Sequence, residues 1–180
     1  MFFLQTLKHT INLHPSYFGP NMLSYLEAKL RDEIEGSCSG RYGYIIRVLT
    51  LISSGQGVIT PSTGVAEFVM EYRAIVFKPF KGEVVDAIVT TVNKMGFFAE
   101  VGPLNMFVSS HLIPSDFNFA QNTNPPQYVS QEKGEVIAKG TKVRLRIVGT
   151  RIDAAEIFAI ATMKEDYLGP HAAGTDLETV

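Results

Sequence analysis

The sequence has little of what marks a disulfide-rich, zinc-binding or membrane protein. Its 180 residues contain one cysteine, Cys38, which excludes an intrachain disulfide framework and a zinc site built from several cysteines. No apolar run approaches the roughly 20 residues that a transmembrane helix needs. Residues 1–8 lack the basic region and the long apolar region of a secretory signal. We therefore expect an intracellular protein.

The chain also lacks an excess of charge of either sign. It has 16 basic and 18 acidic residues, which gives a formal net charge of −2. This balance excludes a protein that coats nucleic acid by bulk attraction, but a local basic face stays possible. The apolar fraction of 46% is that of an ordinary globular chain, and the length allows one large domain or two small ones.

Signals for catalysis are weak. The glycine-containing stretch 36–40 continues with Arg41 and Tyr42, whereas a phosphate-cradling loop requires Lys followed by Ser or Thr. A dinucleotide-binding fingerprint is missing as well. The four histidines lack the spacing of metal ligands: His9, His14, His111 and His171. These motifs therefore predict no cofactor and no metal site, and they leave a catalytic function open without requiring one.

In the first half, the hydrophobic pattern predicts a sheet with one helix packed on it. Met22, Leu26, Leu30 and Ile34 recur every four residues, which predicts one buried face of a helix over residues 21–35. Runs rich in β-branched and aromatic residues predict strands over 7–13, 43–51, 58–60 and 67–77. The expected order is β-α-β-β-β.

In the second half, short strands separated by tight turns replace this pattern. Five strands with a helical turn at 110–115 between the third and the fourth match the plan of an OB-fold barrel. Segment 116–139 is long, polar and contains proline, so we expect a functional or partly disordered loop. The strands are expected over 82–92, 96–101, 104–109, 141–151 and 156–163.

These patterns predict an α+β protein with two domains and a tail. Pro79 cannot donate to a sheet ladder and Gly82 allows a bend, so a junction is expected near these residues. The predicted ranges are 1–80 for the first domain, 81–169 for the OB-fold and 170–180 for a flexible tail.

Phe98 and a row of cations are the best local signals for a function. Alternation along 97–101 turns Phe97 into the core and leaves Phe98 on the outer face. An exposed aromatic ring on an OB sheet can stack a nucleic-acid base with a gain of about 1–3 kcal/mol. Alternatively, a loop, the tail or the neighbouring domain covers Phe98.

The cations alternate with aliphatic residues along the fourth strand of the predicted barrel. Lys142, Arg144 and Arg146 would share one face, and Arg151 would extend the row. If three phosphates of a single strand were neutralised, the log-log salt slope of binding would be about −2. The alternative is a strand face that is merely solvated.

Three further stretches carry a resemblance to a known family: LHPSYFGP at 13–20, EGSCSGRYGY at 35–44 and YRAIVFKPFKGEVVD at 72–86. In them the chain resembles the polymerase stalk family, which includes the seventh subunit of eukaryotic RNA polymerase II and its archaeal stalk counterpart. The resemblance implies a truncated RNP-like tip domain that docks on the polymerase core near the clamp, followed by an OB-fold. It also implies a nuclear, non-catalytic subunit that forms a heterodimer with the fourth subunit and binds emerging single-stranded RNA near the exit path.

The resemblance also implies site residues. The aromatic platform positions of the wider OB class fall on Met95, Phe98 and Ser109, with His111 two residues further on. Together with the cations, the predicted RNA-binding residues are Met95, Phe98, Ser109, His111, Lys142, Arg144, Arg146 and Arg151. The predicted docking residues are His14, Pro15, Tyr17, Phe18, Gly19, Thr60, Pro61 and Gly64.

Two alternatives to this function remain. The same surfaces could serve a purely structural protein–protein interaction module with incidental RNA contact. The chain could also be a nucleotide-processing enzyme on an OB scaffold, which a turnover assay with metal and nucleotide would reveal.

Overall fold

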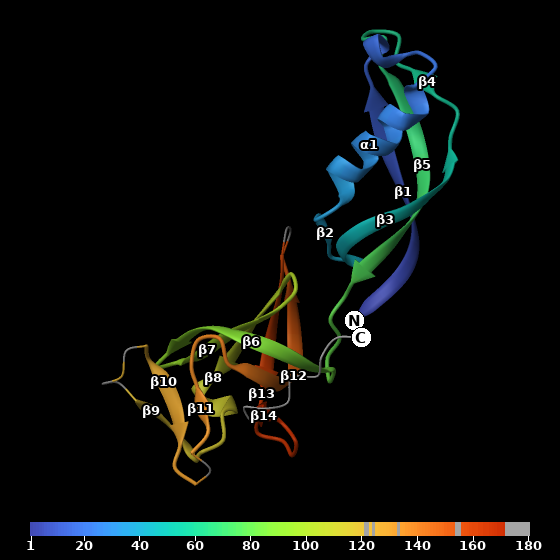
Figure 1. Ribbon diagram of the computed structural model, residues 1–180. Coiled ribbons are helices and arrows are strands. Elements are labelled where there is room, and N and C mark those ends of the chain that lie inside the picture. The colour runs from blue at the N-terminus through green and yellow to red at the C-terminus, as the bar shows by residue number, and fades with distance from the viewer. Residues whose placement is uncertain (121–122, 124, 133, 154–155, 172–180) are drawn as a thin grey trace. The chain divides into compact units, whose positions relative to one another are not determined.

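The computed structural model divides the chain into two compact units, Met1–Lys78 and Pro79–Val180 (Figure 1). It describes residues 1–120, 123, 125–132, 134–153 and 156–171. Its elements confirm the predicted α+β class, with one helix in a mainly stranded first unit and a barrel in the second. In the described part of the chain, every helix is too short or too polar to span a membrane.

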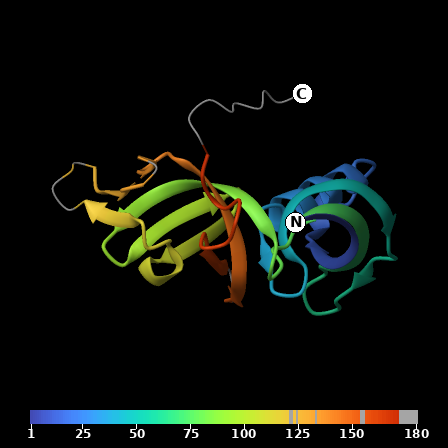
Figure 2. The same cartoon turned by 90° about the horizontal axis from the view of Figure 1, so that it is seen from below.

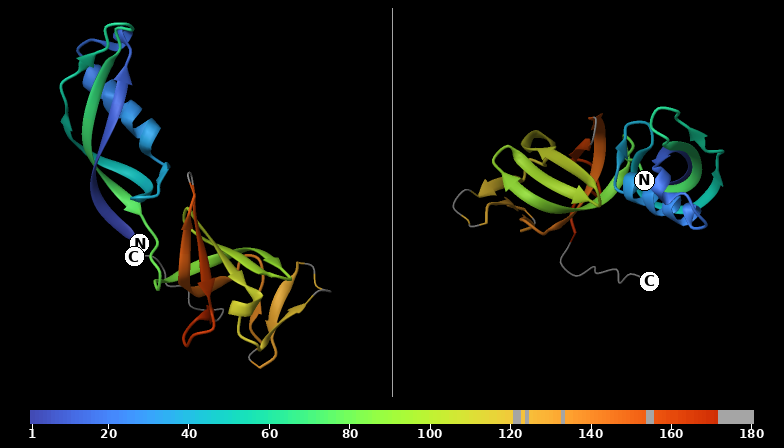
Figure 3. Two further views of the ribbon diagram at one scale, coloured as in Figure 1. Left: turned by 180° about the vertical axis from the view of Figure 1, so that it is seen from behind. Right: turned by 90° about the horizontal axis from the view of Figure 1, so that it is seen from above.

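The first unit is an antiparallel sheet with one helix lying along it (Figures 1 and 3). The strand order is β1-β5-β3-β2, and β4 pairs with the beginning of β5. The strands coil strongly, as the nearly end-on view in Figure 2 shows. The elements are β1 (Phe2–Leu13), α1 (Met22–Ile34), β2 (Cys38–Ser39), β3 (Gly43–Ser54), β4 (Val58–Ile59) and β5 (Ala66–Phe77).

The four-residue spacing explains why α1 packs where it does. Leu26, Leu30 and Ile34 are buried against the sheet, and each such side chain contributes about 2 kcal/mol through removal from water. The helix ends before Gly36, whose positive φ of 81° is a conformation that glycine adopts without strain. The predicted helix is therefore confirmed to within a residue at each end.

The second unit is a barrel. Its sheet has the strand order β13-β8-β7-β6-β12-β14, and an additional pairing of β13 with β12 closes it (Figure 1). All five predicted strands are present, with ends within about two residues of the expectation. They are β6 (Val84–Asn93), β7 (Gly96–Val101), β8 (Leu104–Ser109), β12 (Lys142–Ile152) and β13 (Ile157–Thr162), with the 3-10 turn η2 (Ser110–Leu112) after β8.

The segment expected to be a long loop instead contains a small sheet of β9 (Phe117–Ala120), β10 (Gln127–Ser130) and β11 (Val136–Ile137). Its composition is polar, but Tyr128 and Ile137 are buried. The Tyr128 hydroxyl donates to the carbonyl oxygen of Asn93 at 2.8 Å, which ties the sheet to the barrel. A few well-placed apolar residues therefore anchor these strands.

The predicted flexible tail is wrong at its first residues. Gly169–Pro170 forms β14, in which Gly169 pairs with Arg144 and Pro170 with Val143. The physical reason is that β13 pairs with β12 only from Arg146 onward, so the beginning of β12 has a free edge there. The rest of the predicted tail, residues 172–180, lies outside the described residues.

Candidate nucleic-acid interface and docking loops

The outer face of the barrel carries a pair of aromatic rings, one exposed and one half-buried. Phe97 is fully buried, whereas Phe98 is 40% exposed, as the alternation along β7 predicts. Phe98 stands opposite Phe107 of β8, and the two ring centroids are 4.9 Å apart with an interplanar angle of 43°. We call these two residues the aromatic pair. Phe107 was not among the sequence-predicted site residues, although its buried neighbours in β8 give the same period-two signal.

The aromatic pair belongs to a row that crosses four strands. Thr91 of β6 is in register with Phe98, and Ile160 of β13 is in register with Phe107. Ile160 is 51% exposed. The row therefore presents a mainly apolar surface to solvent, and such a surface can accept the flat face of a base.

The other two predicted platform positions lie beside this row, next to the beginning of β7 and at the end of β8. Met95 is exposed in the turn before β7, and Ser109 ends β8. The hydroxyl of Ser109 accepts the backbone N–H of exposed His111 at 3.4 Å and caps η2. Neither Met95 nor Ser109 supplies a ring, whereas Phe98 and Phe107 place two rings side by side.

Gly96 holds this end of the two strands together. It pairs with Ser109 and has a φ of 144°. A Cβ atom at this position would lie 2.0 Å from the carbonyl oxygen of Val108. Only glycine permits this close approach of β7 to β8, which sets the register that brings Phe98 opposite Phe107.

Two arginines of the predicted cation row, Arg144 and Arg146, are paired with acids. Arg144 donates from Nε and Nη2 to the two carboxylate oxygens of Asp86, at 2.7 and 3.0 Å. His171 Nε2 lies 3.1 Å from the same carboxylate. The hydrogen bond from Arg144 holds the pKa of Asp86 below its usual value, and Asp86 in turn raises the pKa of Arg144.

Arg146 forms a second pair, with Glu165, and its Nε also donates to the carbonyl oxygen of Gly82 at 3.3 Å. Lys142 is exposed at the beginning of β12. Arg151, near the other end of β12, is exposed, and its side chain forms no ion pair or hydrogen bond with any described residue. The sequence could not reveal these pairs, because Asp86 is 58 residues and Glu165 is 19 residues away from its arginine.

The predicted docking residues form two adjacent loops at one end of the first unit. The short 3-10 turn η1 (Pro15–Tyr17) is capped by His14, whose Nδ1 accepts the backbone N–H of Ser16 at 3.3 Å. A Cβ atom at Gly64 would lie 3.4 Å from the Pro15 side chain. Residues 14–19 and 60–64, which we call the docking loops, are therefore side by side.

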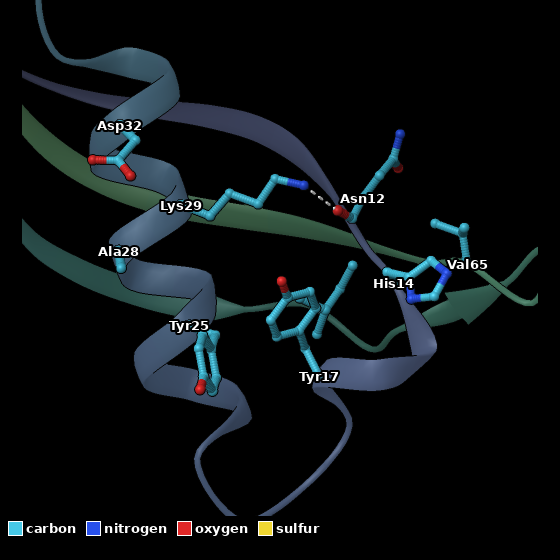
Figure 4. Close-up of a pocket in the computed structure, with 9 residues that line it drawn as sticks. Asn12, His14, Tyr17, Tyr25, Ala28, Lys29, Asp32 and Val65 are labelled. Atoms are coloured by element: carbon cyan, nitrogen blue, oxygen red, sulfur yellow. Dashed lines mark hydrogen bonds between the residues drawn. The ribbon is translucent and has the colours of Figure 1, made fainter.

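A pocket of about 450 Å³ opens beside the docking loops (Figure 4). The rings of Tyr17 from the first loop and Tyr25 from α1 lie side by side, with centroids 5.2 Å apart. Lys29 donates to the carbonyl oxygen of Asn12 at 2.6 Å across the upper side of the pocket. Sequence reasoning missed Tyr25 and Lys29, because they lie on the outer side of a helix that was assigned by its buried face.

Metal binding finds no support in the described residues, where no three His, Cys, Asp or Glu side chains gather in one place. The arrangement offers aromatic stacking on the barrel and exposed aromatic contacts on the docking loops. Both are modes of binding to a partner and neither is a catalytic constellation.

Comparisons with known proteins match both units. Residues 8–64 match the family described as "SHS2 domain found in N terminus of Rpb7p/Rpc25p/MJ0397". Residues 78–159 match the "S1 RNA binding domain" family.

Several curated proteins are similar to the chain over nearly their whole length. "DNA-directed RNA polymerase II subunit rpb7" of Schizosaccharomyces pombe is 63% identical over 170 residues, covering 93% of this chain and 98% of that protein. "DNA-directed RNA polymerase II subunit RPB7" of Saccharomyces cerevisiae is 48% identical over 94% of this chain and 99% of its own. The RPB7 subunit of Glycine max is also 48% identical, over 94% of this chain and 96% of its own.

Proposed function

The chain belongs to the Rpb7 family of DNA-directed RNA polymerase II subunits, and on this premise we propose that it binds emerging single-stranded RNA through the outer face of its barrel. As a member of this family it is a non-catalytic subunit of the polymerase, and it carries an S1 RNA-binding domain. The observation that carries the proposal is the aromatic pair, in which Phe98 is 40% exposed and Phe107 lies half-buried beside it.

Stacking is the main source of the proposed affinity. Each base that stacks on an aromatic ring contributes about 1–3 kcal/mol and does so with little sequence preference. Two of the predicted cations, Arg144 and Arg146, are paired with acidic side chains. Each arginine must therefore release its carboxylate partner before it can bind a phosphate of the RNA. The expected binding is therefore weak, tolerant of sequence and only mildly dependent on salt.

We further propose that the first unit attaches the subunit to the polymerase. The docking loops carry the exposed aromatic residues Tyr17 and Phe18, and rigid aromatic side chains are effective anchors at protein interfaces. Near the clamp and the RNA exit path, this attachment would hold the barrel beside the transcript. The family resemblance also supports a heterodimer with the fourth subunit and a nuclear location.

A purely structural interaction module is the second candidate function. The pairing of Arg144 with Asp86 and of Arg146 with Glu165 favours it, because paired cations attract a phosphate backbone less than free ones do. In this case the exposed aromatic face would bind protein, and RNA contact would be incidental.

Two pairs of substitutions separate these functions. Phe98→Ala with Phe107→Ala is expected to weaken binding of a labelled oligo-uridine by about tenfold or more, and to leave co-purification with the polymerase unchanged. Tyr17→Ala with Phe18→Ala is expected to reduce co-purification with the polymerase and to leave RNA affinity unchanged. If the barrel variant binds RNA like the wild type but loses a protein partner, the structural module is the correct function.

A further inference from the structure

A third aromatic residue lies on the outer face of the barrel, on β13, with a cation beside it on β12. Phe158 of β13 is 42% exposed. Its register partners are Arg151 of β12 on one side and Asn105 of β8 on the other. Because residues in register project to the same side of a sheet, these three side chains share the outer face.

This group adjoins the aromatic pair. Ile160, two residues after Phe158, is in register with Phe107, and the residues between and beside them in β13 point into the core. Phe158 is therefore one strand across and two residues along from Phe107. From the usual strand spacing and rise, the two Cα atoms are about 8 Å apart. Phe158 with Arg151 and the aromatic pair therefore form neighbouring parts of one outer face.

Arg151 differs from the other arginines of β12 in being available. Arg144 is held by Asp86 and Arg146 by Glu165, whereas the guanidinium of Arg151 has no partner among the described side chains. A free guanidinium beside an exposed ring matches the two parts of a nucleotide, since the ring can stack a base and the cation can bind a phosphate.

We infer that Phe158 and Arg151 form a second subsite for single-stranded RNA, continuous with the aromatic pair. Phe158 stacks a base, Arg151 binds a neighbouring phosphate, and Asn105 offers an amide to the edge of a base between the two stacking positions. The inference rests on the proposed RNA-binding function and extends it from β7 and β8 to β13 and β12. The free arginine favours RNA over an apolar protein surface as the occupant.

The test measures binding of the full chain to a fluorescein-labelled oligo-uridine of about 12 nucleotides, within the site size of one OB-fold. Phe158→Ala is expected to lower the affinity about tenfold and to leave the salt slope unchanged. Arg151→Gln is expected to lower the affinity and to make the log-log salt slope shallower by about 0.7. Phe2→Ala is the control, because Phe2 is also an exposed phenylalanine but lies in the first unit, outside the docking loops; it should bind RNA like the wild type.

Two further measurements guard against a variant that merely misfolds. Phe158→Tyr keeps the stacking ring and is expected to retain wild-type affinity. In the wild-type chain, an oligonucleotide containing 4-thiouridine should crosslink to the peptide that contains Phe158. Failure of this crosslink, or wild-type affinity in both Phe158→Ala and Arg151→Gln, overturns the second subsite.

The outcomes also distinguish this inference from the function on which it rests. If Phe98→Ala weakens RNA binding while Phe158→Ala and Arg151→Gln do not, the second subsite is wrong and the proposed function stands. If none of the three weakens RNA binding, both are wrong. If Phe158→Ala releases a protein partner and leaves RNA affinity unchanged, this part of the face is a protein interface.

Discussion

Releasing Arg144 and Arg146 from their acidic partners should convert a mildly salt-dependent RNA-binding surface into a strongly salt-dependent one. The change is the double substitution Asp86→Asn with Glu165→Gln, which keeps the size of both side chains and removes both negative charges. In the wild type each guanidinium is already neutralised by a carboxylate. In the variant both are available to phosphate, and the affinity for RNA should rise at low salt.

The magnitude follows from the number of phosphates that each protein neutralises. With Arg151 as the one available arginine of β12 in the wild type, one phosphate contact gives a log-log slope of about −0.7; three contacts give about −2. Between about 50 mM and 200 mM salt, wild-type affinity should therefore fall about threefold, and that of the variant about twentyfold.

Fluorescence anisotropy with oligo-uridine over this range of salt measures both slopes. Glu27→Gln with Glu67→Gln is the matched control, because it removes two negative charges from the first unit, at residues with no ion pair to any described arginine. The control should keep the wild-type slope. If the variant also keeps the wild-type slope, or if the wild type already has a slope near −2, the paired arginines do not limit phosphate binding and the reasoning is refuted.

Three other predictions concern stability and are measured by chemical denaturation. Gly96→Ala should lower the free energy of unfolding by more than about 2 kcal/mol, because a Cβ atom there meets a backbone carbonyl oxygen at 2.0 Å. Gly102→Ala, with open space around it, should lower it by about 1 kcal/mol. Phe97→Ala should lower the free energy of unfolding by about 3–5 kcal/mol, because it leaves a cavity in the core, whereas Phe98→Ala should lower it by less than about 1 kcal/mol. Asp86→Asn should cost about 0.5–1 kcal/mol at pH 7. Because the pKa of Asp86 is lowered in the folded state, this difference should persist above about pH 4 and disappear as the pH falls through the lowered pKa; a difference that grows in acid would contradict the assignment.

Periodicity in the sequence was sufficient to predict most of the fold. The four-residue spacing that ends at Ile34 predicted α1, and two-residue alternation predicted that Phe97 is buried and Phe98 exposed. These features depend on contacts between each residue and one common core, so the local pattern records them. The small sheet around Tyr128 was not predicted, because its core consists of isolated apolar residues within a polar segment.

The candidate site was less predictable because it depends on pairings between distant residues. Alternation correctly put Arg144 and Arg146 on the outer side of β12, but it could not show that Asp86 and Glu165 meet them there. In the same way, Phe107 becomes part of the site only through its register with Phe98. Register and ion pairing join positions that are far apart in the chain, and no local pattern encodes them.

The central claim is that RNA lies on the outer face of the barrel, over the aromatic pair. Backbone amide chemical shifts of the full chain, followed by NMR during titration with oligo-uridine, test it most directly. The account predicts that the shifted amides concentrate in β7 and β8 around Phe98 and Phe107. Shifts confined to the first unit, or none at saturating RNA, would contradict it.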